Sequence, residues 1–189
     1  GTSNMDTFDD ALEFRFKPDQ TWATAHEDDK AAVKRLWEWI YSCKGNPTKF
    51  LNEYAEYFGN DSPFAWYLIT DYFMAVDNRA KNMMLVTWDG KIWYFIPYDM
   101  DTVFGERNDS VLKYDYTITW ETMDESIGSY AFAGHDSVLW ELVRGCPDKL
   151  REVADKLRST MSLEYVLKVF NEEMMGNWCE RIYNKDGIY

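Results

Sequence analysis

Apolar residues recur at helical spacing in several stretches of the chain and predict a mostly helical protein. One helix is expected over about residues 29–43, and a second runs from Pro47 to about residue 57. A third helix, over about residues 63–76, is apolar on nearly all sides, so we expect it to lie at the centre of the fold. Later helices are predicted at about residues 137–143, 148–159 and 162–180, and Ser162 is the expected cap of the last one.

The same spacing predicts which faces of these helices are buried. The face expected to be buried on the first helix consists of Ala32, Val33, Leu36, Trp37, Ile40 and Tyr41. On the second helix it consists of Phe50, Leu51, Tyr54 and either Tyr57 or Phe58. Asp61 is the expected N-cap of the third helix, with Pro63 in its first turn. Residues 12–16 alternate between apolar and polar and predict a short strand.

Two apolar runs, residues 83–88 and 91–97, stand on either side of Asp89-Gly90. This dipeptide between apolar runs is typical of a β-hairpin with a two-residue turn. The predicted fold is therefore α+β, mostly α-helical, with a central β-hairpin.

Oxygen-bearing side chains stand at both open ends of this hairpin. Asp77 and Asn82 lead into its first strand, and Asp99 and Asp101 follow its second strand. Because a hairpin brings its two ends together, we expect these four side chains to converge. Three carboxylates and one amide suit a hard divalent cation such as Mg²⁺ or Mn²⁺.

Asp77 is expected at the C-terminal end of the third helix, where the helix dipole is unfavourable for a carboxylate. A cation or hydrogen bonds would have to offset that charge, which favours a functional role. The alternative is that Asp77-Asn78 only terminates the helix.

The interval from Asp77 to Asn82 is that of a protein-kinase catalytic loop, which a short hairpin and a metal-binding Asp follow. With the residues that follow, this stretch resembles the CotH family of atypical protein kinases, named for a spore-coat kinase. The resemblance covers about 35 residues and rests on Asp77, Asn82, Trp93, Pro97, Tyr98, Asp99, Met100, Asp101, Phe104 and Gly105.

The resemblance implies a protein-kinase-like C-lobe whose hairpin carries a metal loop. Asp77 would be the catalytic base, and Asn82 and Asp99 would hold divalent ions against the phosphates of ATP. Asp101 would be a second metal ligand or would fix the first; Asp99 directly ends the strand and is the preferred principal ligand. The substrate would be a protein Ser/Thr hydroxyl.

Several features depart from an ordinary kinase. Met74-Ala75-Val76 stands where His-Arg would precede the catalytic Asp, and no Gly-rich loop precedes Asp77. The lysines that could bind phosphate have no recognisable strand context; they are Lys34, Lys44, Lys49 and Lys81. We therefore expect residues 11–189 to be one CotH-kinase-like domain, a fragment whose missing nucleotide lobe lies upstream. Residues 1–10 are expected to be disordered or derived from cloning.

Composition narrows the classes of partner. The 189 residues carry a net charge of −13, which argues against binding to nucleic acid or to an anionic membrane. The charge would attract a basic protein substrate, although it also serves solubility. Aromatic residues make up 17% of the chain, which indicates an aromatic-rich core or a surface that stacks on ligands. Three widely spaced cysteines indicate buried or incidental thiols rather than disulfides.

Three functions stay open at this point. The first is a CotH-like kinase lobe, and the second is a non-catalytic module of the same fold that serves assembly or attachment, for example in a phage particle. The third is a metal-dependent hydrolase, because convergent Asp residues also suit two-metal hydrolysis. The chain contains no recognisable signal peptide and no apolar stretch long enough to insert into a membrane, so a cytoplasmic or virion-associated location is expected.

Overall fold

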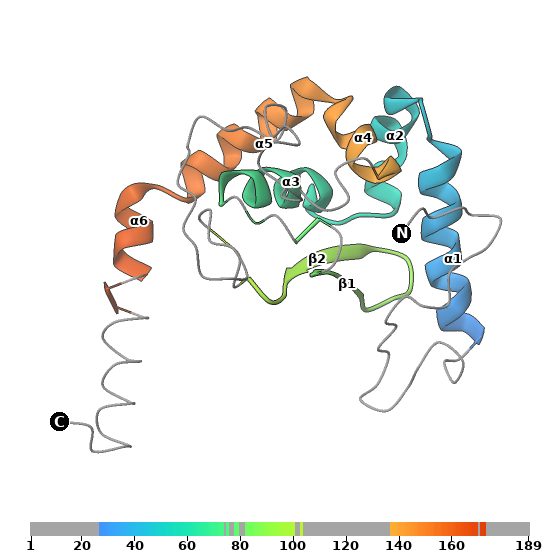
Figure 1. Ribbon diagram of the computed structural model, residues 1–189, viewed down its shortest axis with the longest axis horizontal. Coiled ribbons are helices and arrows are strands. Elements are labelled where there is room, and N and C mark those ends of the chain that lie inside the picture. Colours follow the sequence, from blue (N-terminus) through green and yellow to red (C-terminus); the bar gives the residue numbers. More distant parts are fainter. Residues whose placement is uncertain are drawn as a thin grey trace, which may run out of the picture. The chain divides into compact units, whose positions relative to one another are not determined.

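The computed structural model describes residues 27–73, 75, 78–79, 82–100, 103, 137–169 and 171–172. Over these residues it contains helices and one two-stranded antiparallel sheet (Figure 1). The predicted class, α+β and mostly helical, is confirmed. The chain divides into two compact units, Gly1–Leu150 and Arg151–Tyr189. The strand predicted at residues 12–16 lies outside the described residues.

Helix α1 (Glu27–Ser42) buries Val33, Leu36, Trp39 and Ile40. The prediction missed Trp39 and placed Ala32, Trp37 and Tyr41 on the buried face, whereas these three are only half-buried. Trp39 is buried because it stacks on Phe50 and Tyr57, with ring centroids 5.4 and 4.0 Å away.

Helix α2 (Pro47–Glu53) continues into the 3-10 turn η2 (Tyr54–Glu56). The Asn46 side chain caps α2 by accepting a hydrogen bond from the backbone N–H of Lys49. Leu51 was predicted to be buried but is 37% exposed, since it lies on the outer face of this short helix. The predicted aromatic core is confirmed; its buried members are Trp39, Phe50, Tyr54, Phe58, Phe64, Trp66, Tyr67, Trp93 and Trp140.

Helix α3 (Ser62–Tyr72) begins where it was predicted to begin, but Asp61 does not cap it with its side chain. The Asp61 carboxylate instead accepts a hydrogen bond from the Tyr54 hydroxyl (2.5 Å) and pairs with Lys149 (3.1 Å). Asp61 therefore occupies the predicted N-cap position, but the predicted capping by its side chain is wrong, because Tyr54 and Lys149 bind the carboxylate instead.

Helix α3 also ends at Tyr72, earlier than predicted. The Thr70 hydroxyl donates back to the carbonyls of Trp66 and Tyr67 (2.8 and 3.0 Å), and the Thr70 carbonyl accepts from the N–H of Ala75. The predicted end of the helix near residue 76 is therefore wrong, and Asp77, which was expected at that end, lies outside the described residues.

Helix α4 (Val138–Arg144) packs against α1, α2 and α3, and helix α5 (Pro147–Thr160) follows it. Cys43 and Cys146 are buried free thiols, as predicted, and burial raises the pKa of both above its usual value. The third cysteine, Cys179, lies outside the described residues.

The hairpin consists of β1 (Met83–Thr87) and β2 (Trp93–Pro97), and its register pairs Met83 with Pro97 and Thr87 with Trp93. Five residues connect the strands, so the predicted two-residue turn at Asp89-Gly90 is wrong. The register differs by one residue from the one that turn would give, which changes which side chains share a face.

Side chains explain the longer connection. The Asp89 carboxylate accepts hydrogen bonds from the backbone N–H groups of Lys91 (2.8 Å) and Ile92 (2.9 Å). Gly90 adopts a φ of 69°, and Arg35 of α1 donates to the carbonyls of Gly90 and Lys91. The connection is therefore shaped by an Asx-turn at Asp89 and by a distant arginine, and the rule for two-residue hairpin turns includes neither.

Aromatic packing attaches the hairpin to the helices, and the hairpin lies below α3 in the view of Figure 1. The ring of Phe95 on β2 stacks on Phe58 and Trp66 and touches Trp140, with centroids 5.5 to 5.8 Å apart. The outer edge of β2 also pairs with the chain after η2, since Trp93 exchanges backbone hydrogen bonds with Tyr57 and Gly59. The hairpin is therefore held on its face and along one edge.

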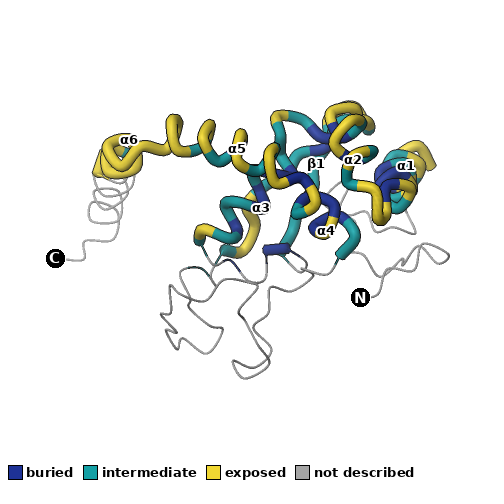
Figure 2. Tube along the Cα trace, turned by 90° about the horizontal axis from the view of Figure 1, so that it is seen from above, coloured by how far each residue is buried: buried dark blue, intermediate teal, exposed yellow. Residues whose placement is uncertain are grey.

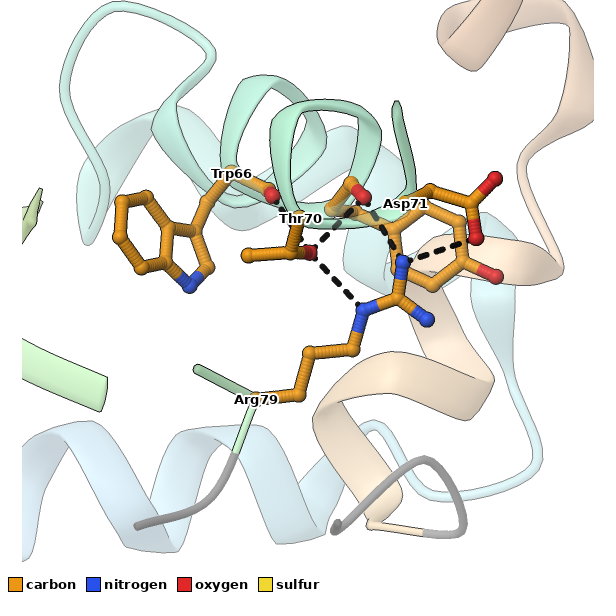
Figure 3. A network of polar contacts seen from close by, with 5 residues as sticks. Trp66, Thr70, Asp71 and Arg79 are labelled. Carbon is orange, nitrogen blue, oxygen red and sulfur yellow. Dashed lines mark hydrogen bonds and ion pairs between the residues drawn. The ribbon is translucent and has the colours of Figure 1, made fainter. Parts of the chain in front are cut away.

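A buried guanidinium lies beneath the last turn of α3 (Figure 3). Arg79 donates from Nε to the Thr70 hydroxyl (2.9 Å) and from one terminal nitrogen to the Tyr67 carbonyl (2.9 Å). The same nitrogen pairs with Asp71 at 3.1 Å. Burial lowers the pKa of Arg79 while the Asp71 carboxylate acts in the opposite direction, and the group stays charged because an arginine pKa is so high.

The described part of the second unit includes α6 (Leu163–Lys168), which Ser162 caps as predicted by accepting from the N–H of Tyr165 (3.1 Å). Figure 2 shows α6 exposed along its whole length. No helix in the described part of the chain offers the length of apolar sequence that spanning a bilayer requires.

We expect Arg79→Met to lower the free energy of unfolding by about 3 kcal/mol, because it removes the ion pair with Asp71 and the buried hydrogen bonds of the guanidinium to Thr70 and Tyr67. Urea denaturation measures this change. Arg158→Met is the matched control, since Arg158 also pairs with an aspartate but its side chain is 81% exposed. The control should change the free energy by less than about 0.5 kcal/mol. Equal losses in the two variants would contradict a stabilising role of the buried network.

The backbone N–H groups of Ile92 and then Lys91 hold the pKa of Asp89 below its usual value. A carboxyl group with a lowered pKa in the folded state stabilises the protein above its unfolded pKa of about 3.9, and this contribution is lost as the pH falls through the folded value. Asp89→Asn keeps the acceptor oxygen without the charge. We expect the variant to be less stable at neutral pH and the difference to shrink as the pH falls below about 4. A difference that stays constant into acid would refute this assignment.

Candidate functional site

The hairpin register places Asn82, just before β1, and Asp99, just after β2, at the same end of the sheet. The Asn82 side-chain amide nitrogen donates a hydrogen bond to the Asp99 carbonyl at 3.1 Å. The structure therefore brings together two of the four residues predicted to converge, which are 17 positions apart in sequence.

Asn82 and Asp99 each carry an oxygen of the type that hard cations prefer. Because the Asn82 nitrogen is bound to the Asp99 carbonyl, the carboxamide oxygen lies on the other side of the amide group. Asp99 is exposed, and its backbone has a φ of 48°, in the left-handed region that Asp and Asn tolerate better than most residues. Asn82 is half-buried. One amide oxygen and one carboxylate are thus available to Mg²⁺ or Mn²⁺.

Asp77 and Asp101, the other two predicted site residues, lie outside the described residues. Within the part of the chain that the structure describes, no three His, Cys, Asp or Glu side chains gather where one metal ion could bind. Of the four predicted site residues, Asn82 and Asp99 are the two that the structure describes.

Sequence reasoning missed Asn78, a fully buried residue behind this pair. Its side-chain nitrogen donates to the Tyr98 carbonyl at 2.9 Å and to the Asn82 carbonyl at 3.3 Å. One carboxamide thus bridges the entry to β1 and the exit from β2. One alternative from the sequence is that Asp77-Asn78 only terminates the helix, whereas the Asn78 side chain joins two strand ends.

Two buried tryptophans fix the backbone at Asn78 and Arg79 through hydrogen bonds. The indole N–H of Trp66 donates to the Asn78 carbonyl, and that of Trp140 donates to the Arg79 carbonyl, both at 2.8 Å. Consecutive carbonyls are therefore held by α3 and α4, while the Arg79 guanidinium is held by α3. The one signal available in the sequence was a pair of strongly polar residues next to Asp77, without any indication that they are buried.

The described contacts of the candidate lysines give no evidence that they bind phosphate. The ammonium group of Lys49 donates to the hydroxyl of Ser42 (2.8 Å) and to its carbonyl (3.4 Å), so it helps to close the end of α1. Lys34 and Lys44 are exposed on or just after α1, and Lys81 lies outside the described residues.

Comparison with known proteins adds one positive result. Neither a search of curated proteins nor a search of solved structures returned a match. A family model described as CotH kinase protein matches residues 5–184, which is nearly the whole chain. A kinase family implies the use of ATP. With Asn82 and Asp99 joined at the end of the hairpin and the family pattern extending over both units, this chain belongs to the CotH kinase family.

Proposed function

We propose that this chain is a kinase-like C-lobe that transfers the γ-phosphoryl group of ATP to a Ser or Thr hydroxyl of a protein, using Mg²⁺ or Mn²⁺. The observation that carries the proposal is the hydrogen bond between the Asn82 carboxamide and the Asp99 carbonyl. It joins the two segments that carry an amide oxygen and a carboxylate. These residues stand five and 22 positions after Asp77, which is the order of parts in a kinase site.

Each residue has a separate role in this proposal. The Asp77 carboxylate orients the attacking hydroxyl and accepts its proton while the hydroxyl oxygen bonds to the γ-phosphorus and ADP leaves. The Asn82 oxygen and the Asp99 carboxylate are metal ligands, and Asp101 is a further ligand or orients Asp99. Divalent ions bound there would neutralise charge on the phosphates during transfer.

The buried support of the site fits this chemistry. Phosphoryl transfer is catalysed mainly by positioning and charge neutralisation, so its ligands must be held in place. Asn78 and Arg79 are buried and hydrogen-bonded to two tryptophans, while Asp99 is exposed to incoming ions. A rigid base below an accessible ligand is the arrangement that a metal-nucleotide site requires.

A non-catalytic assembly module is the second candidate. The observation that favours it is Ala75, which is fully buried in the segment where kinases place the His-Arg that precedes the catalytic Asp. Such a module would bind an assembly partner and transfer no phosphate. A metal-dependent hydrolase, the third possibility, would release inorganic phosphate without labelling a protein.

We expect Asp99→Asn to weaken Mn²⁺ binding roughly tenfold or more, because the variant loses a charged ligand. Asparagine tolerates the left-handed backbone at this position, so the fold should persist. Calorimetric titration with Mn²⁺ and then with Mn²⁺-ATP measures the effect. The matched control is Asp89→Asn, which removes a carboxylate at the closed end of the same hairpin and should leave the affinity unchanged. Equal affinity in wild type and Asp99→Asn would remove Asp99 from the site.

Asp77→Asn should lower the rate of phosphoryl transfer by about 10²–10⁴-fold, because the variant lacks the base that accepts the hydroxyl proton. Its affinity for Mn²⁺-ATP should stay within a few-fold of wild type. The assay follows the radiolabelled γ-phosphoryl group into Ser/Thr peptides and, separately, into inorganic phosphate. Metal-nucleotide binding without transfer in the wild type would favour the assembly module, and phosphate release alone would favour the hydrolase.

A further inference from the structure

Burying the side chain of Asn78 is energetically unfavourable unless its amide group makes hydrogen bonds. It is fully buried, and among the described residues no donor reaches its carboxamide oxygen. An unsatisfied acceptor in the interior destabilises a protein, and an apolar side chain of similar size would avoid that loss. The reason for an amide at this position must therefore lie in what its nitrogen donates to.

The amide nitrogen of Asn78 has two acceptors, one at each open end of the hairpin. It donates to the Asn82 carbonyl (3.3 Å), just before β1, and to the Tyr98 carbonyl (2.9 Å), just after β2. The Asn82 carboxamide then donates to the Asp99 carbonyl (3.1 Å). Three hydrogen bonds from two asparagines thus connect the segments that carry the proposed metal ligands.

The other side of Asn78 is anchored to the core. Its carbonyl accepts from the Trp66 indole, and the next carbonyl in the chain accepts from the Trp140 indole. The side chain therefore extends from a fixed backbone, so its two donated bonds place the strand ends relative to α3 and α4 and not only relative to each other.

We infer that Asn78 is a positioning residue that sets the separation and orientation of the Asn82 oxygen and the Asp99 carboxylate for a divalent cation. The inference rests on the proposed function, because it assigns Asn82 and Asp99 to metal binding. Asn78 itself contacts neither metal nor substrate. Residues that orient metal ligands in this way typically change metal affinity 10–100-fold when they are substituted.

The test compares two truncations of fully buried polar side chains. Asn78→Ala removes the bridge between the strand ends, whereas Thr70→Ala removes a hydroxyl that contacts α3 and Arg79 and does not face the hairpin ends. Both variants should lose thermal stability. Titrated with Mn²⁺ alone below the melting temperature of either variant, Asn78→Ala should bind about tenfold or more weakly. Thr70→Ala should bind within about twofold of wild type.

The possible results distinguish the positioning role of Asn78 from the proposed metal site itself. If wild type binds Mn²⁺ and Asn78→Ala binds it equally well, the positioning role is overturned while the proposed metal site stands. An equal loss of affinity in both variants likewise overturns the positioning role, since any buried truncation would then suffice. If wild type itself binds no Mn²⁺, the proposed function fails and the inference fails with it.

A measurement on the wild type covers the case in which Asn78→Ala does not fold. The side-chain amide protons of Asn78 should exchange with solvent more slowly when Mg²⁺ is added, because a bound ion would stabilise the strand ends that accept their hydrogen bonds. The matched reference is the indole proton of Trp140, which bonds to Arg79 and should respond less. Exchange of the Asn78 amide that is insensitive to Mg²⁺ binding would overturn the inference.

Discussion

Two consecutive buried polar residues, Asn78 and Arg79, hold the structure around the candidate site together. Their carbonyls accept the indole N–H groups of Trp66 and Trp140, which come from different helices. Their side chains then go to different partners, with Arg79 binding the end of α3 and Asn78 binding the ends of the hairpin. Because buried polar groups are costly when unpaired, these bonds restrict where the helices and the hairpin can lie.

Burial decreases from Asn78 and Arg79 toward the proposed ligands. Asn78 is fully buried, Asn82 is half-buried and Asp99 is exposed. In the proposed function, such a gradient would let Asn82 and Asp99 exchange water for a cation, while the groups proposed to orient them stay within a packed interior. The stacking of Phe95 on Trp66 and its contact with Trp140 link the same tryptophans to β2. The aromatic core and the polar site are therefore parts of one support.

The sequence predicts elements that depend on local chemistry better than those that depend on distant contacts. Helices are present at the predicted places of α1 and α4, and the Ser162 cap is in place, because these features involve residues within one or two turns. The hairpin was expected, but its register was not, since the distant Arg35 binds the connection and an Asx-turn at Asp89 replaces the two-residue turn.

The buried residues Asn78 and Arg79 were not predicted to support the site, because their contacts also join residues that are distant in sequence. The bond between the Trp140 indole and the Arg79 carbonyl joins residues 61 positions apart, and no periodicity marks such a pair. Polar residues are also usually exposed, so nothing in the sequence indicated that Asn78 is buried. The pairing of Asn82 with Asp99 was foreseeable because any hairpin brings its open ends together, whichever turn connects the strands.

The central claim is that a divalent cation binds at the open end of the hairpin. Paramagnetic broadening of amide resonances by sub-stoichiometric Mn²⁺ tests it most directly, because the broadening falls steeply with distance from the ion. Five residues of each strand separate the two ends of the hairpin by roughly 17 Å. We predict strong broadening at Asn82 and Asp99 and little at Gly90. Broadening centred at Gly90, or none at either end, would contradict the claim.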